Sequence, residues 1–249
     1  MKMDLVREFF SKIGEIATQI DTTTVFPLPF DYSPADLLTF AENELSRDTP
    51  DSLANSFSHT ERALGAQLDY FLSSYGLKHI TSSTKWGNKR KIELIGDLGL
   101  VPDRILHKVN EVRIELEHRY RFPSQPTAVN SLDVVQMFVA ATDMYLFPAR
   151  VAIQYEIPND VPKTSFLERI TAEPLHKLFL QLDAQKSVFE LSGAVNGMEV
   201  NLEISALQQF KDFLYILVFF LHFHRFDMPN ASRFFEGIRL LNQAKQNGT

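Results

Sequence analysis

The hydrophobic positions between the N-terminus and Pro148 repeat with the period of an α-helix. Apolar side chains recur every three or four positions from Lys2 to Ile20, which predicts a first helix. Pro27 and Pro29 interrupt this pattern, and Ser33 followed by Pro34 is typical of a new helix start. Further helices are predicted over residues 34–47, 51–75, 86–97, 102–119 and 127–147. Because the connections between them are short, they are predicted to form a bundle.

After Pro148 the apolar positions alternate with a period of two, which predicts strands. The segments VAIQYEI, LFLQL, SVFELSGAV and MEVNLEI all show this alternation. Only Asn196-Gly197 separates the last two, and this dipeptide is the strongest short signal for a β-hairpin. Helical periodicity returns at Ser205, which has capping-box spacing to Gln208, and a last helix is predicted over residues 229–245.

The change of period predicts an α+β protein with three regions. Residues 1–30 are interpreted as an N-terminal helix and linker, residues 31–149 as a helical bundle, and residues 150–249 as an α+β domain. The last region is expected to be a small antiparallel sheet packed by two helices.

Composition narrows the chemistry that this chain of 249 residues can perform. It has no cysteine, which excludes disulfides, thiolate nucleophiles and Cys-ligated zinc. No secretory leader is recognisable, and the longest apolar run, Phe213–Phe223, is shorter than the roughly 20 residues that span a bilayer. We therefore expect a cytoplasmic protein with no membrane segment. The net charge of −6 argues against a protein whose whole surface binds nucleic acid non-specifically, but it is compatible with a local basic patch.

Val109–Tyr120, with the sequence VNEVRIELEHRY, carries the most distinctive set of polar side chains. At about 100° per residue, three sets of side chains occupy different faces of this helix. A core stripe contains Ile105, Val109, Val112 and Leu116; Arg113, Glu117 and Tyr120 flank it; His107, Ile114 and His118 lie opposite. Arg113 and His118 therefore diverge on one straight helix, and the apolar Ile114 needs a second partner. A purely structural alternative is an Arg113–Glu117 pair with His118 near the helix end.

The spacing Arg113–x4–His118–x–Tyr120 is followed by RFPSQP and preceded by the helix SLANSFSHTERALGAQLDYFLSSYGL. Together these features resemble the HEPN (higher eukaryotes and prokaryotes nucleotide-binding) superfamily over residues about 34–147. The motif is similar to that of the toxin component of HEPN/MNT toxin–antitoxin pairs. The resemblance implies a metal-independent endoribonuclease without a cofactor, acting as a dimer. Two copies of the helix would then form one composite cleft, with Ile114 and His107 at the dimer interface.

The resemblance also implies roles for individual residues. His118 is expected to be the general base or acid at the RNA 2′-hydroxyl, and Arg113 to hold the scissile phosphate, leaving a cyclic phosphate end. Tyr120 matches the tyrosine that a nucleotidyltransferase-type antitoxin modifies with AMP. Asn110 and Glu117 are expected to line the site. Many relatives carry a polar residue where this chain has Ile114, which favours an alternative: a catalytically silent HEPN-type interaction or nucleotide-sensing protein.

Residues 84–122 are locally basic, with nine Lys and Arg against six acids. Cations around a tryptophan suit phosphate contact and base stacking, whereas the structural alternative is a solvated helix start with Trp86 packed inward. The RNA-binding candidates are Lys85, Trp86, Lys89, Arg90, Lys91, Arg119 and Arg121. No sequence motif for a metal site, a phosphate loop or a serine nucleophile is present. A helical protein unrelated to either HEPN interpretation stays the third alternative.

Overall fold

The computed structural model describes residues 2–11, 17–101, 105, 107, 108, 111, 114, 123–157 and 176–222. The described residues fall into two compact units. One unit contains those of Met1–Thr24 and Ala149–Ser232, and the other those of Val25–Pro148. The chain thus divides after Thr24 and after Pro148, where the sequence analysis placed divisions after residues 30 and 149. The described residues mix helix and sheet, as expected for an α+β protein.

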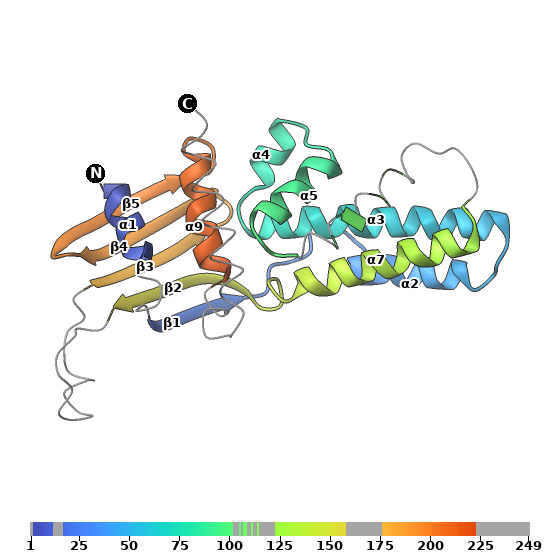
Figure 1. Cartoon of the computed structure of the whole chain (residues 1–249), viewed down its shortest axis with the longest axis horizontal. Helices are drawn as coiled ribbons and strands as arrows, with labels where there is room; N and C mark the ends of the chain where they lie inside the picture. The colour runs from blue at the N-terminus through green and yellow to red at the C-terminus, as the bar shows by residue number, and fades with distance from the viewer. Residues whose placement is uncertain are drawn as a thin grey trace, which may run out of the picture. The chain divides into compact units, whose positions relative to one another are not determined.

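The first unit is built on an antiparallel sheet of five strands in the order β1-β2-β3-β4-β5 (Figure 1). The strands are β1 Ala17–Thr24, β2 Ala149–Ile157, β3 His176–Asp183, β4 Val188–Val195 and β5 Met198–Ser205. Along β3, Leu178, Leu180 and Leu182 are buried while Lys177 and Gln181 are exposed. One face of β3 therefore packs on the core and the other meets solvent.

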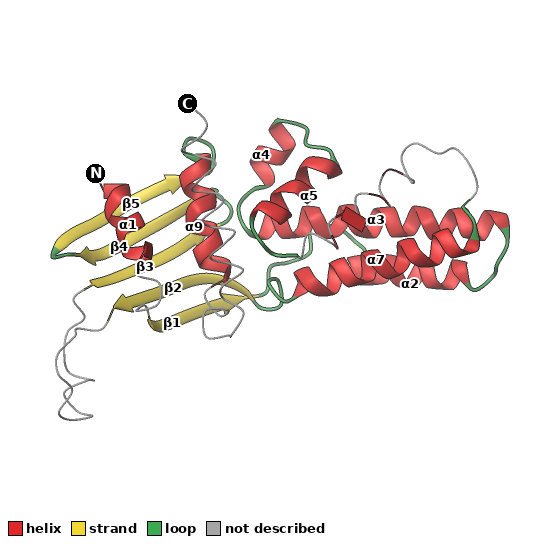
Figure 2. Cartoon of the chain, in the orientation of Figure 1, coloured by secondary structure: helices red, strands yellow, loops and turns green. Residues whose placement is uncertain are grey.

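The helices α1 (Lys2–Ser11) and α9 (Phe210–His222) pack against this sheet (Figure 2). The ring of Phe10 on α1 stacks on the ring of Phe219 on α9, with 4.2 Å between the ring centroids. It meets the ring of Tyr155 on β2 edge-on, with 5.3 Å between the centroids. The Tyr155 hydroxyl donates to the Phe219 carbonyl over 3.1 Å. This aromatic cluster joins both helices to the core face of the sheet.

The hairpin predicted at Asn196-Gly197 is confirmed. Val195 pairs with Met198, and the two turn residues have φ angles of 53° and 72°. Both positive φ values belong to a two-residue turn of the type that follows the twist of the strands. The Asn-Gly pair fits because asparagine tolerates this region and glycine adopts it without steric cost.

The helix predicted from Lys2 to Ile20 is wrong in its second half. It ends at Ser11, and Ala17–Thr24 instead forms β1, which pairs with β2 from Ala17↔Glu156 to Thr24↔Ala149. The apolar spacing extends into this segment, but the sequence ATQIDTTT is rich in β-branched residues that favour a strand. Pairing with β2 supplies the backbone hydrogen bonds that decide between the two conformations.

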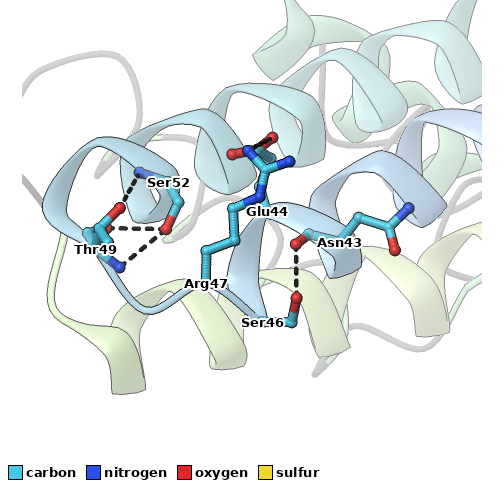
Figure 3. Close-up of polar contacts among 6 residues, drawn as sticks. All are labelled: Asn43, Glu44, Ser46, Arg47, Thr49 and Ser52. Atoms are coloured by element: carbon cyan, nitrogen blue, oxygen red, sulfur yellow. Dashed lines mark hydrogen bonds and ion pairs between the residues drawn. The ribbon is translucent and has the colours of Figure 1, made fainter.

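The second unit is a bundle in which α2 (Pro34–Leu45) and α7 (Gln125–Asp143) lie along α3 (Pro50–Ser74) (Figure 1). The helix start predicted at Ser33-Pro34 is confirmed, because the Ser33 and Asp36 side chains form a capping box. A second capping box joins Thr49 and Ser52 at the start of α3 (Figure 3). Each proline stands in the first helical turn, where its missing N–H costs nothing.

Several predicted helix limits differ from the structure. The short helix α4 (Lys78–Ser83) was not predicted, and the helix expected over 86–97 is α5 (Asn88–Asp97). Ser205 ends β5 instead of capping a helix, since α9 starts only at Phe210. The helix expected over 229–245 lies outside the described residues.

The apolar run that begins at Phe213 forms the larger part of α9. Its side chains are mostly buried against the sheet, including Phe213, Leu217 and Phe220. Within the described part of the chain, every helix is too short or too polar to cross a membrane. The described part of the run is therefore a core helix.

Candidate functional site

The segment 102–122, which includes the Arg–x4–His–x–Tyr motif, is described at five positions, none of them a motif residue. Ile105, His107, Lys108, Glu111 and Ile114 are all helical, in agreement with the helix predicted over 102–119. His107 and Glu111 are exposed, and the apolar side chain of Ile114 is 41% exposed. Ile114 thus lies outside the core of the unit, as its place on the helical wheel predicts. The candidates Asn110, Arg113, Glu117, His118, Arg119, Tyr120 and Arg121 lie outside the described residues.

The turn between α4 and α5 presents a second group of predicted site residues. The backbone N–H of Trp86 donates to the Thr81 carbonyl over 2.9 Å, and Lys85 has a φ of 50°, so the chain turns sharply after α4. Gly87, in an extended conformation, then caps the N-terminus of α5. The Arg90 guanidinium consequently lies over the Trp86 ring, 4.1 Å from its centroid. We define the basic corner as Lys85, Trp86, Lys89 and Arg90.

The cations of this region differ in how far carboxylates neutralise them. Lys91, outside the basic corner, forms an ion pair of 2.6 Å with Asp69 of α3, and its side chain is only 12% exposed. Lys89 lies 3.9 Å from Glu93 in an exposed pair, a geometry that contributes little. Among the described residues, no carboxylate pairs with Lys85 or Arg90. Lys91 therefore anchors α5 to α3, while the basic corner keeps most of its positive charge.

A buried polar cluster between α3 and α7 was not predicted from the sequence. The Gln67 amide donates to Thr142 Oγ1 over 2.7 Å and to Asp143 Oδ1 over 2.8 Å. One turn along α3, the Tyr70 hydroxyl donates to the Phe26 carbonyl over 2.8 Å. Burial raises the pKa of Asp143 above its ordinary value, and the Gln67 hydrogen bond opposes this. Burial and the nearby Asp143 charge raise the pKa of Tyr70.

This cluster has the properties of a structural contact. Gln67 lies in a run of core residues between Leu64 and Leu68, and its amide oxygen is buried without a hydrogen-bond partner in the described residues. The three hydrogen-bonding side chains fix the register of α3 against α7, because each buried donor must meet its acceptor. The sequence offers no local signal for it, since the partners are 75 and 76 positions apart.

Asp143→Asn tests the electrostatic cost of this cluster. A raised carboxylate pKa means that the folded state binds its proton more tightly, so stability falls as pH rises from the unfolded pKa through the folded one. Above the folded pKa the full penalty is present, and the amide removes it while its oxygen still accepts from Gln67. We expect the variant to be as stable as wild type near pH 3 and equally or more stable at pH 7. Thermal melts at both pH values measure this, and a loss of stability confined to pH 7 would contradict it.

The described residues contain no group of three or more histidine, aspartate or glutamate side chains placed to hold a metal ion. Comparisons with known proteins found no matching family model, no matching characterised protein and no matching solved structure.

Proposed function

We propose that this protein is a metal-independent endoribonuclease of the HEPN type that acts as a dimer. The observation that carries the proposal is the Arg113–x4–His118–x–Tyr120 motif, beside an apolar side chain, Ile114, that is 41% exposed. Two copies of this helix packed across a twofold axis would bury Ile114 and bring diverging Arg and His side chains into one cleft. The helices α2, α3, α4, α5 and α7 support the proposal, because the superfamily that the motif resembles is a helical bundle.

The proposed reaction uses only protein side chains and the RNA itself. His118 takes the proton of the 2′-hydroxyl, whose oxygen then attacks the neighbouring phosphorus. The bond from phosphorus to the 5′-oxygen breaks, and this leaving oxygen gains a proton. The products are a 2′,3′-cyclic phosphate and a 5′-hydroxyl end. Arg113 stabilises the charge that develops on the phosphate, because its planar fork of donors matches two phosphate oxygens.

The same resemblance supports a setting and a partner. The protein would work in the cytoplasm, in a toxin–antitoxin or phage-defence system. A nucleotidyltransferase-type antitoxin would modify Tyr120 with AMP, adding charge and bulk beside the cleft. Asn110 and Glu117 would line that cleft, one helical turn before Arg113 and one after it.

The direct test is cleavage of labelled RNAs in excess chelator by the full-length protein at a concentration where it is verified to be dimeric. The proposal predicts cut RNA. If several RNAs remain intact with a folded dimer, the ribonuclease proposal fails. The result would favour the alternative of a catalytically silent HEPN-type interaction or nucleotide-sensing protein, which the apolar Ile114 beside Arg113 also supports.

Ile114→Glu tests the proposed dimer interface. A charge buried in an apolar contact without a partner is costly, so we expect the dimer dissociation constant to rise about tenfold or more, with cleavage lost in parallel. Sedimentation or light scattering measures the dissociation. Leu207→Glu is the matched control, since Leu207 is also an exposed apolar residue but lies outside the bundle. An Ile114→Glu protein that stays dimeric at wild-type concentrations would rule out Ile114 as an interface residue.

A further inference from the structure

The basic corner belongs to a stretch of the chain in which every Lys, Arg, Asp or Glu is a Lys or Arg. From Tyr70 to Ile92 there is no aspartate or glutamate, while this stretch contains five cations, in a protein whose net charge is −6. Asp69 neutralises one of the five, Lys91. Lys85, Lys89 and Arg90 are exposed around the α4–α5 turn, so the stretch presents positive charge to solvent. A local surface of this kind attracts a polyanion even when the whole protein is acidic.

The geometry of the corner suits a base as well as a phosphate. The Arg90 guanidinium carbon lies over the ring of the half-buried Trp86, 4.1 Å from the ring centroid. A stacked guanidinium presents its second face to a nucleobase and keeps N–H donors at its rim for a phosphate. Lys85 directly precedes Trp86, and Lys89 directly precedes Arg90. Each lysine can therefore reach the backbone of a strand whose base stacks on Arg90.

We propose that the basic corner binds single-stranded RNA, with Arg90 stacking on a base and Lys85 and Lys89 contacting the flanking phosphates. The inference rests on the proposed function, because it assigns this surface to the RNA substrate. Arg90 can stack only on an unpaired base, because the bases of a duplex are stacked on one another. The exposed neighbours Ser82, Ser83 and Thr84 are small and polar, and the aromatic side chain of the corner, Trp86, is half-buried with Arg90 over its ring. The corner therefore lacks the exposed apolar side chains that insert into a lipid surface.

The binding experiment uses the full chain carrying His118→Ala, which prevents cleavage of the probe. Fluorescence anisotropy measures its affinity for a labelled oligouridine of about 12 nucleotides. Lys85→Ala/Lys89→Ala/Arg90→Ala in this background is expected to raise the Kd about 10- to 100-fold at ~0.1 M salt. The slope of log Kd against log salt concentration, which reports the number of counterions released on binding, should fall by about two. The control variant Lys177→Ala/Lys186→Ala/Lys211→Ala removes equal charge from the sheet unit and should bind like its parent.

A second variant separates stacking from charge. Arg90→Lys keeps the positive charge but loses the planar group, so the Kd should rise at least about fivefold with an unchanged salt dependence. Wild-type affinity in this variant would overturn the stacking role. Circular dichroism and thermal melts establish that each variant is folded before its affinity is compared.

RNA binding by the basic corner and RNA cleavage can fail independently of each other. Equal affinity of the triple variant and its parent overturns the basic corner as the binding site, even if wild-type protein cuts RNA. Binding that depends on the corner in a protein that never cuts RNA supports the corner and overturns the ribonuclease. Tighter binding to duplex RNA or to phosphatidylserine vesicles than to oligouridine, lost in the same triple variant, assigns the corner to another partner and overturns the proposal.

Discussion

His118→Ala is expected to lower RNA cleavage in excess chelator by about 10²–10⁴-fold, the usual contribution of a general acid or base. An imidazole titrates near neutrality, so it can take a proton from the 2′-hydroxyl, and alanine cannot. The wild-type rate should therefore change with pH around the histidine pKa, and the residual rate of the variant should lose this dependence. Single-turnover cleavage across a pH series measures both quantities.

The matched control for this prediction is His79→Ala. His79 is an exposed histidine on α4 that belongs to neither the motif nor the basic corner. Its removal should leave cleavage at the wild-type rate. If His118→Ala cleaves as fast as wild type while remaining a folded dimer, His118 is not the proton-transfer group, and the assignment of the motif helix as catalytic is wrong.

Gly193→Ala is expected to destabilise the sheet unit by about 3 kcal/mol or more. Gly193 lies inside β4 with a φ of 146°, a backbone conformation that L side chains rarely adopt. A Cβ atom there would lie 2.0 Å from the carbonyl oxygen of Lys177 on β3, so the two strands would have to separate. For a chain of this size the midpoint of thermal unfolding should fall by roughly 6–12 °C.

Gly65→Ala is the matched control, and its expected change in the free energy of unfolding is zero or stabilising. Gly65 lies within α3, where an added Cβ would meet only Asn88 Nδ2 at 3.9 Å, an ordinary contact. Alanine is about 1 kcal/mol more favourable than glycine in a helix interior, so this variant should be unchanged or more stable. Calorimetry of both variants measures the contrast. A Gly193→Ala protein that melts with wild type would contradict the strand geometry described for β4.

The elements that the sequence predicted well are those whose signals are local. Ser33-Pro34 and Thr49-Pro50 mark helix starts with residues that act within one turn, and Asn196-Gly197 defines its hairpin through two backbone angles. The strand β1 was missed because its identity depends on β2, whose Ala149 pairs with Thr24 across 125 positions. A single window of sequence contains only the helical spacing and not the partner strand.

In the candidate site, too, local contacts could be predicted from the sequence and non-local contacts could not. The contact of Arg90 with Trp86 spans one helical turn, so the clustering of cations and tryptophan in the sequence predicted that these side chains lie together. The pairing of Lys91 with Asp69 joins two helices, and no local pattern distinguished Lys91 from its exposed neighbours. The Gln67 and Asp143 contact is also non-local and was missed. Local spacing thus predicts which residues share a face, while tertiary packing decides which charges stay unpaired.

The most direct test of the central claim is mass spectrometry of the new ends of RNA incubated with the dimer in excess chelator. The proposed chemistry predicts a 2′,3′-cyclic phosphate on one fragment and a 5′-hydroxyl on the other, both absent with His118→Ala. Fragments ending in a 3′-hydroxyl and a 5′-phosphate, or RNA that stays intact, would contradict the claim that this chain is a metal-independent ribonuclease.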